Sequence, residues 1–162
     1  MCIRDRLAVL ASQPGRTVSN DVLVDAIWDG DPPEAAARTF RSYVARLRRS
    51  FDRAGVEGTA VVRTDSAGYR LVPGVDVDAV RFEVEASRAR DRVRKGELAE
   101  AVRLTGDALD RWEGRAFDRF ADRMWAAPVA ARLEELRRAT LELRARALLD
   151  GDRVPQAVAL LE

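Results

Sequence analysis

The spacing of hydrophobic residues predicts two short helices near the start of the chain. The apolar residues of segment 7–11 share one helical face, and the turn sequence QPG at 13–15 ends that segment. A second helix is predicted to begin after Ser19, whose hydroxyl can cap it, and to extend to Trp28. A helix, a turn and a second helix therefore precede position 29.

A longer third helix is predicted from about Glu34 to Arg53. The helix-breaking sequence DGDPP at 29–33 precedes it, and Gly55 and Gly58 close it. At about 100° per residue, the large apolar side chains of this helix fall on one arc and most of its arginines on the opposite arc. The apolar arc contains Phe40, Tyr43, Val44, Leu47 and Phe51, and the opposite arc contains Arg38, Ser42, Ala45 and Arg49, with Arg41 and Arg46 at its shoulders.

The chain then changes to a strand-like pattern. Branched and aromatic residues at 61–62 and 69–72 flank the turn sequence DSAG at 65–68, which predicts a β-hairpin. The sequence PGVD at 73–76 follows as a linker. Three helices followed by a hairpin form a winged helix-turn-helix with a β-hairpin wing.

Helical patterns dominate the rest of the chain, so the predicted fold class is mainly α. One helix runs from Asp76 or Asp78 to Lys95, another spans 97–111, and a long one spans 128–149 before the last helix begins. The sequences GELAEAVRL and GDRVPQAVALL resemble each other weakly. This indicates stacked helical hairpins of the tetratricopeptide kind, at a spacing longer than that repeat normally has.

Large aromatic residues lie in the less regular stretch 112–126, between two predicted helices. They can fill the core between hairpins, or they can anchor a partner protein on an open helical surface. Core filling is the favoured interpretation. The four residues are Trp112, Phe117, Phe120 and Trp125.

Charge is segregated locally although the total is nearly balanced. The chain of 162 residues has 28 basic and 27 acidic residues, a formal net charge of +1. Residues 33–53 nevertheless contain six arginines against two acids, whereas 19–31 contains four aspartates and no base. A solvated helix face more often alternates arginine with an acid four residues away, but no acid occurs within 35–51. This segregation favours a binding site for a polyanion.

The composition excludes most catalytic sites. The chain contains no histidine and one cysteine, Cys2, so a disulfide framework and a Cys/His metal site are excluded. No Gly-rich phosphate loop is present, and carboxylates such as Glu134 and Glu135 lie on an arginine-rich helix where surface ion pairing is expected. We predict that this segment is not an enzyme and needs no cofactor or metal. The early apolar run 7–11 is too short for a membrane span, so we expect a cytoplasmic protein.

Both ends predict a fragment of a longer protein. The sequence MCIRDR at 1–6 is interpreted as a non-native leader, and the segment 7–11 as the second half of a helix. The chain stops at AVALLE, inside an apolar-periodic segment with no stop signal. Missing strands before the first helix are expected to uncover part of the apolar core, namely Leu7, Leu10, Leu23 and Ile27.

Two stretches together resemble a known family over roughly residues 7–162. The sequences VSNDVLVDAIWDGDPPEAAARTFRSYVARLRRSF and VVRTDSAGYRL are similar to the winged-helix DNA-binding domain of OmpR-type response regulators. The sequences DVDAVRFE, ALDRWEGRAF and ARLEELRRATLELRARAL resemble the bacterial transcriptional activator domain. The combination is similar to the Streptomyces antibiotic regulatory protein family. It implies a winged-helix domain at 7–74 without its N-terminal strands, and a C-terminally truncated, tetratricopeptide-like activator domain at 77–162.

The resemblance implies a transcriptional activator that binds double-stranded promoter DNA and recruits RNA polymerase. Residues 33–53 would be the recognition helix, and the loop Asp29, Gly30 and Asp31 would contact polymerase. The family binds repeated DNA sites, so self-association of the protein on DNA is a possible consequence that the sequence does not decide. The sequence also does not decide whether the parent protein carries an ATPase module further along. The implied DNA contacts are Arg38, Thr39, Arg41, Ser42 and Arg46 in the groove, and Arg48 and Arg49 on phosphates.

The wing departs from the family pattern. Asp65 and Ser66 occupy the tip, where related domains tend to carry an arginine that enters the minor groove. An acid there is expected to repel phosphate, and Arg63 on the strand is the candidate replacement. The alternative function, a helical-repeat scaffold that binds proteins and not DNA, remains open at this point.

Overall fold

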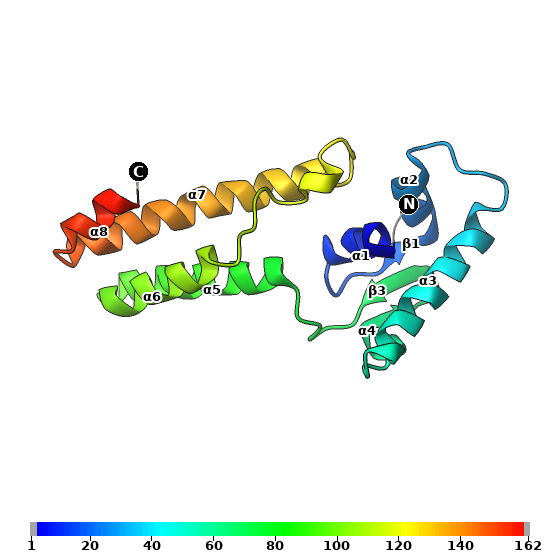
Figure 1. The fold of residues 1–162 in the computed structure, drawn as a ribbon, viewed down its shortest axis with the longest axis horizontal. Helices are drawn as coiled ribbons and strands as arrows, with labels where there is room; N and C mark the ends of the chain where they lie inside the picture. Colours follow the sequence, from blue (N-terminus) through cyan, green and yellow to red (C-terminus); the bar gives the residue numbers. More distant parts are fainter. Residues whose placement is uncertain (1–2, 161–162) are drawn as a thin grey trace. The chain divides into compact units, whose positions relative to one another are not determined.

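The structure, a computed structural model, describes residues 3–160 and divides the chain into two compact units. The first unit contains the residues through Val77 together with Arg119–Pro128, and the second contains Asp78–Asp118 and the residues from Val129 on (Figure 1). The return of Arg119–Pro128 to the first unit was not predicted.

Three helices form the body of the first unit. They are α1 (Ile3–Ala11), α2 (Asn20–Trp28) and α3 (Ala36–Arg53). The Ser19 hydroxyl accepts a hydrogen bond from the Val22 amide at 3.3 Å, which confirms the predicted cap of α2. Helix α1 begins inside the segment predicted as a leader, whose first two residues lie outside the described part of the chain. Helix α3 starts two residues later than expected, after a turn in which the amide of Ala36 bonds to the Pro33 carbonyl.

A three-stranded antiparallel sheet covers these helices. Its strands are β1 (Val18–Ser19), β2 (Val62–Thr64) and β3 (Gly68–Leu71), in the order β1-β3-β2. The predicted hairpin is confirmed as β2 and β3. Strand β1 was not predicted, because two residues cannot show an alternating pattern. Gly58, expected to close α3, instead begins the short helix α4 (Gly58–Val61).

The core of the first unit is closed within the described residues. Leu10, Leu23 and Ile27 are at most 2% exposed, so the expected uncovering does not hold for them, whereas Leu7 is only partly buried. The cover comes in part from Trp125, which packs against the same cluster from the segment Arg119–Pro128.

Helices build the second unit, which confirms a mainly α fold. They are α5 (Asp78–Arg94), α6 (Leu98–Leu109), α7 (Ala127–Asp150) and α8 (Val154–Ala159). A 3-10 turn, Asp118–Phe120, lies between α6 and α7.

The weak sequence repeat corresponds to a structural one. Ala101 of α6 and Ala157 of α8 are both buried, and they lie in the same cluster with Ala147 and Leu148 of α7. Each follows a turn that contains a left-handed residue, Gly96 or Asp152. The repeated alanines therefore mark two places where a helix packs closely onto its neighbour.

The aromatic residues of 112–126 fill cores. Trp112 meets Phe82 edge-on, with ring centroids 5.1 Å apart, and Phe117 packs into the same cluster of the second unit. Phe120 lies 5.3 Å from Trp125 in the first unit. All four residues are half-buried and in contact with neighbouring side chains, which favours packing over an open aromatic surface.

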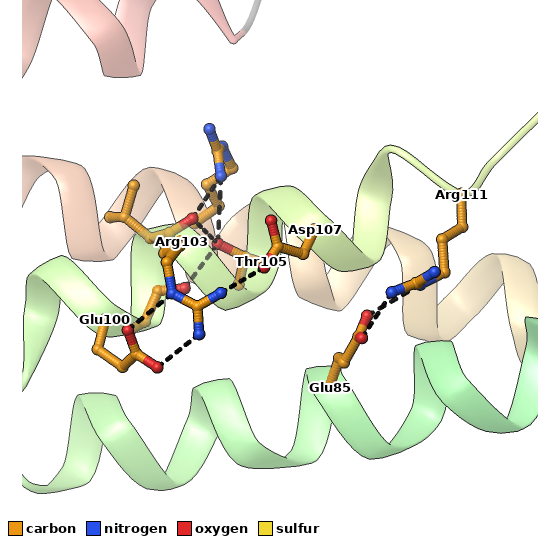
Figure 2. A network of polar contacts seen from close by, with 9 residues as sticks. Glu85, Glu100, Arg103, Thr105, Asp107 and Arg111 are labelled. Atoms are coloured by element: carbon orange, nitrogen blue, oxygen red, sulfur yellow. Dashed lines mark hydrogen bonds and ion pairs between the residues drawn. The ribbon is translucent and has the colours of Figure 1, made fainter.

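Several arginines of the second unit are paired with its own acids. Arg111 donates two hydrogen bonds to Glu85, and Arg103 lies between Glu100 and Asp107 (Figure 2). The hydrogen bonds from Arg103 hold the pKa of the Glu100 carboxyl below its usual value. Any stabilisation from this exposed pair is present at pH values above the ordinary pKa of the carboxyl. It is lost as the pH falls through the lowered pKa that Glu100 has in the folded protein.

We expect the Gly58→Ala substitution to destabilise the first unit by about 1–3 kcal/mol. A Cβ at this position would lie 2.5 Å from the Arg48 carbonyl oxygen and 2.6 Å from the Arg48 Cα. These are backbone atoms of α3 and cannot move aside as a flexible side chain could. Urea unfolding followed by circular dichroism measures the change.

The matched control for Gly58→Ala is Thr59→Ala, at the neighbouring exposed position of the same short helix. We expect this control to shift the unfolding midpoint by much less. Equal unfolding midpoints for Gly58→Ala and the unmodified chain would mean that the backbones of α4 and α3 are not in close contact at this position.

Candidate nucleic-acid interface

Helix α3 has one buried face and one exposed, cationic face. Phe40, Val44 and Leu47 are 2–3% exposed and belong to the core of the first unit. The opposite face is exposed, as the helical periodicity predicted. Its exposed members are Arg38, Arg41, Ser42, Ala45, Arg46 and Arg49.

The arginines of this face are not neutralised by the chain's own acids. Within residues 3–160, Arg38, Arg41, Arg46 and Arg49 take part in no ion pair. The Nε atoms of Arg41 and Arg49 donate hydrogen bonds to carbonyls one turn earlier in α3, at 3.3 and 3.4 Å. Each bond uses only the Nε donor of its guanidinium. The exposed face of α3 therefore presents concentrated positive charge to solvent.

Short residues lie in the middle of the cationic face. Ser42 donates its hydroxyl hydrogen to the Thr39 carbonyl at 2.7 Å, so toward solvent it can act only as an acceptor. Ala45 adds no bulk beyond its methyl group. Thr39 itself is half-buried and is the least accessible of the predicted groove contacts. The centre of the face is thus low, with long side chains on both sides of it.

Arg48 differs from the other arginines of α3. It is half-buried, and its Nε donates to the Val62 carbonyl at 2.9 Å while its Nη2 donates to the Thr64 hydroxyl at 2.8 Å. Its guanidinium carbon lies 6.0 Å from the centroid of the Tyr69 ring. The structure therefore directs Arg48 toward strand β2 and away from the exposed cationic face, where it was expected to reach phosphate.

The acid at the wing tip is compensated. The Asp65 carboxylate accepts a hydrogen bond from the Thr17 hydroxyl and pairs with the Arg70 Nε at 2.9 Å. The expected repulsion of phosphate by a free acid at this position is therefore weakened. Ser66 is exposed beside it.

Arg63 is the exposed cation of the wing. It lies opposite Arg70 in the pairing of β2 with β3, but Arg70 is engaged by Asp65. Arg63 is in no ion pair among the described residues. Arg63 on the wing and the arginines on the exposed face of α3 are therefore the cations of these two elements that have no acidic partner among the described residues.

The loop after α2 has a fixed backbone. Asp29 adopts a left-handed conformation (φ 58°), and its amide donates to the Asp25 carbonyl at 2.7 Å. Gly30 follows with φ 85°, where glycine is favoured. The Asp29 carboxylate lies 3.2 Å from Nη1 of Arg123, and Asp31 is exposed. The loop therefore displays acids on a defined turn.

Sequence reasoning missed two contributors to this surface. Thr17, which anchors the wing tip, precedes a strand too short to give a pattern. Arg123 reaches Asp29 from a segment more than ninety residues further along the chain. No local sequence signal connects such positions, although the aromatic Trp125 nearby indicated that this stretch packs somewhere. Metal-ligating clusters are absent from residues 3–160, and no helix there is long and apolar enough to cross a membrane.

Known proteins resemble both units. Residues 77–162 match the family described as bacterial transcriptional activator domain, and residues 4–71 match the C-terminal domain of transcriptional regulatory proteins. The transcriptional regulatory protein MoaR1 of Mycobacterium bovis is 36% identical over 110 residues, which are 67% of this chain and 35% of MoaR1. The regulatory protein DnrI of Streptomyces peucetius is 34% identical over 147 residues, 87% of this chain and 54% of DnrI.

A solved structure of Mycobacterium tuberculosis EmbR, in complex with a low-affinity phosphopeptide, has the same fold. The TM-score is 0.89 at 29% identity, over 97% of this chain and 42% of the EmbR chain. The matched part of the chain thus spans roughly a third to a half of each of these three relatives. From these matches and the fold, the chain belongs to the transcriptional regulators of the Streptomyces antibiotic regulatory protein type, which join a winged helix to a bacterial transcriptional activator domain.

Proposed function

We propose that this chain is the DNA-binding and activating part of a transcriptional activator, with α3 as its recognition helix. The observation that carries the proposal is the exposed face of α3, on which four arginines have no acidic partner within the described residues. A helix fits the major groove of DNA, which is about 12 Å wide. The buried face fixes α3 to the body of the domain, so that the cationic face is presented outward.

The side chains divide by reach. Arg38, Arg41 and Arg46 are long enough to reach base edges from the low centre of the face, with Thr39 and Ser42 beside them. Arg49, near the end of α3, and Arg63, on the wing, are assigned to phosphates. Arginine is suited to both roles, because its fork-shaped guanidinium can donate two parallel hydrogen bonds to guanine or to phosphate.

The loop Asp29, Gly30 and Asp31 is proposed as the contact with RNA polymerase. Its left-handed turn fixes the direction of the exposed acids, so a basic partner would meet a preformed surface. The assignment also follows the family resemblance, since this loop is a place where OmpR-type domains can meet polymerase. Alanine at Asp31 should then reduce transcription activation in vitro and leave duplex binding unchanged.

The domain boundaries proposed from the sequence, 7–74 and 77–162, are supported by the division of the chain after Val77. The alternative function, a protein-binding scaffold without DNA binding, is the weaker proposal. Its suggested aromatic anchors are half-buried, and Trp112, Phe117 and Trp125 pack against the cores, which leaves less of them for a partner. An activator of this type works where promoter DNA is, in the cytoplasm, and we propose no enzymatic activity for this segment. Self-association on repeated sites stays a prediction.

Salt titration of DNA binding tests the proposal directly. We expect the logarithm of the association constant to fall linearly with the logarithm of salt concentration, by about 0.9 per phosphate neutralised. Arg49 and Arg63 alone would give a slope of about −1.8, and further phosphate contacts make it steeper. Fluorescence anisotropy measures it on a duplex that the protein has enriched from a random pool.

The control for this titration is a scrambled duplex of equal length, which should bind more weakly than the enriched duplex. A chain that enriches no duplex, while residues 77–162 alone still capture a protein partner, would replace the activator by the scaffold.

A further inference from the structure

Arg48 joins the recognition helix to the wing. Its two hydrogen bonds end on Val62 and Thr64, the residues on either side of Arg63 in strand β2. Side chains alternate along a strand, so Arg63 points away from the face on which Thr64 meets α3. Arg48 thus fixes the strand from which Arg63 projects without touching Arg63 itself.

Strand β2 is the element whose position depends most on this link. Among the described residues, it lies at the edge of the sheet and pairs with β3 alone. The turn of the hairpin is already held from its other side, by Thr17 on Asp65 and by the Asn20 amide on the Ala67 carbonyl at 3.2 Å. On the α3 side, the Arg48 guanidinium supplies donors that an edge strand otherwise lacks.

The charge of Arg48 is partly withdrawn from solvent by these contacts. Nε and Nη2 are committed to β2, and the guanidinium lies beside the Tyr69 ring. Arg49, the next residue, is exposed and bonds only within its own helix, by Nε. Two adjacent arginines of α3 therefore have different environments, and Arg49 is the more open of the two to a phosphate.

We propose that Arg48 is a positioning residue for DNA recognition, which holds β2 at a fixed place relative to α3. This inference rests on the proposed function. With the link made, Arg63 and the cationic face of α3 are displayed as one rigid pair and can meet the same duplex without prior ordering. Without it, β2 has to be ordered when DNA binds, and the affinity for the specific site falls.

Substitutions that break the link without removing a charge test the inference. Thr64→Val keeps the shape of the side chain and removes the hydroxyl acceptor, and Arg48→Lys keeps the charge and loses the two-pronged geometry. For the 162-residue chain on the enriched duplex, we expect both to weaken binding on the order of tenfold. The slope of affinity against salt should stay as in the unmodified chain. Thr64→Ser, which restores the hydroxyl, should bind normally.

Arg49→Ala is the comparison for a true phosphate contact. It should lower the salt slope by about 0.9, whereas Arg48→Ala should leave the slope unchanged while weakening binding. Hydrogen exchange of the β2 amides, measured without DNA, should be faster in Thr64→Val and in Arg48→Lys. This readout reports the link itself, independently of any duplex.

Two results would overturn the inference. Normal binding and normal β2 exchange in both Thr64→Val and Arg48→Lys would show that the link does not position the strand. A fall in salt slope for Arg48→Ala equal to that for Arg49→Ala would make Arg48 a phosphate contact. Failure of the unmodified chain to bind any duplex would instead overturn the proposed function, and it would be seen before any variant is compared.

Discussion

Alanine at Arg38, Arg41 and Arg46 together should lower affinity for the specific duplex by at least about a hundredfold, since each base-reading arginine contributes about 1–3 kcal/mol. The three side chains are exposed on one face of α3 and have no acidic partner among the described residues. Within the protein, their removal takes away only the exposed hydrogen bond from the Arg41 Nε to the Ala37 carbonyl, so the expected loss is of contacts with DNA. The preference for the specific duplex over a scrambled one should fall with the affinity.

The fold should survive this triple substitution. Alanine has the highest helix propensity, and the buried face of α3, with Phe40, Val44 and Leu47, is untouched. Circular dichroism and the urea midpoint should match those of the unmodified chain. A loss of DNA binding in a folded protein can then be assigned to the lost side chains.

A second triple variant controls for net charge. Arg88, Arg138 and Arg146 are exposed on α5 and α7 of the second unit. Their replacement by alanine changes the formal net charge from +1 to −2, which is the change that the α3 variant makes. We expect this control to keep most of its affinity. Equal losses in both variants would show that overall charge governs binding, and unchanged binding in the α3 variant would remove α3 as the recognition helix.

Faces of long elements could be predicted from the sequence. Eighteen residues of α3 give five turns of apolar periodicity, so the burial of Phe40, Val44 and Leu47 and the exposure of the arginines followed directly. The hairpin was predicted because branched and aromatic residues flank a turn sequence. Strand β1 and helix α4 contain two and four residues, too few for either period to show.

The partners of individual side chains could not be predicted. Arg48 and Arg49 are neighbours in one basic helix, and composition gives no reason to separate them. The difference arises because β2 lies beside α3 in space, where Val62 and Thr64 offer acceptors to one arginine only. The same holds for Asp65, which was expected to repel phosphate and is instead paired with Arg70 from the facing strand.

Contacts between segments far apart in the chain could not be predicted from the sequence either. Trp125 was correctly expected to fill a core, but the sequence could not say which one. It packs on the first unit although the helices on both sides of it in the chain belong largely to the second. Burial of a single aromatic residue depends on tertiary contacts, and periodicity reports only contacts that repeat along one element.

Phe40→Ala should destabilise the first unit by about 3–5 kcal/mol, a large part of the 5–15 kcal/mol typical of a domain. Phe40 is 2% exposed, and its ring meets Tyr69 of β3 edge-on at a centroid distance of 5.4 Å. Truncation leaves a cavity between α3 and the sheet and removes this ring contact. Hydrogen exchange measured by mass spectrometry should show faster exchange in α3 and β3.

The second unit provides an internal reference for this variant. Peptides from α5 and α6 lie in a separate core, so their exchange should be unchanged. Phe51→Ala is the matched control within α3, because Phe51 is only partly buried and should cost less. Uniform acceleration across both units would mean that they unfold together, and normal protection of α3 would mean that Phe40 does not anchor it.

Phe40→Ala should also weaken binding to the specific duplex, although it removes no charge and touches no predicted DNA contact. The cationic face of α3 is useful only while the helix is held against the sheet, because the arginines must approach the groove from one rigid surface. If affinity falls with stability in Phe40→Ala and recovers at low temperature or in a stabilising osmolyte, the loss comes from the anchoring of α3. The triple arginine variant should show no such recovery, because its fold is intact and the missing groups cannot be restored.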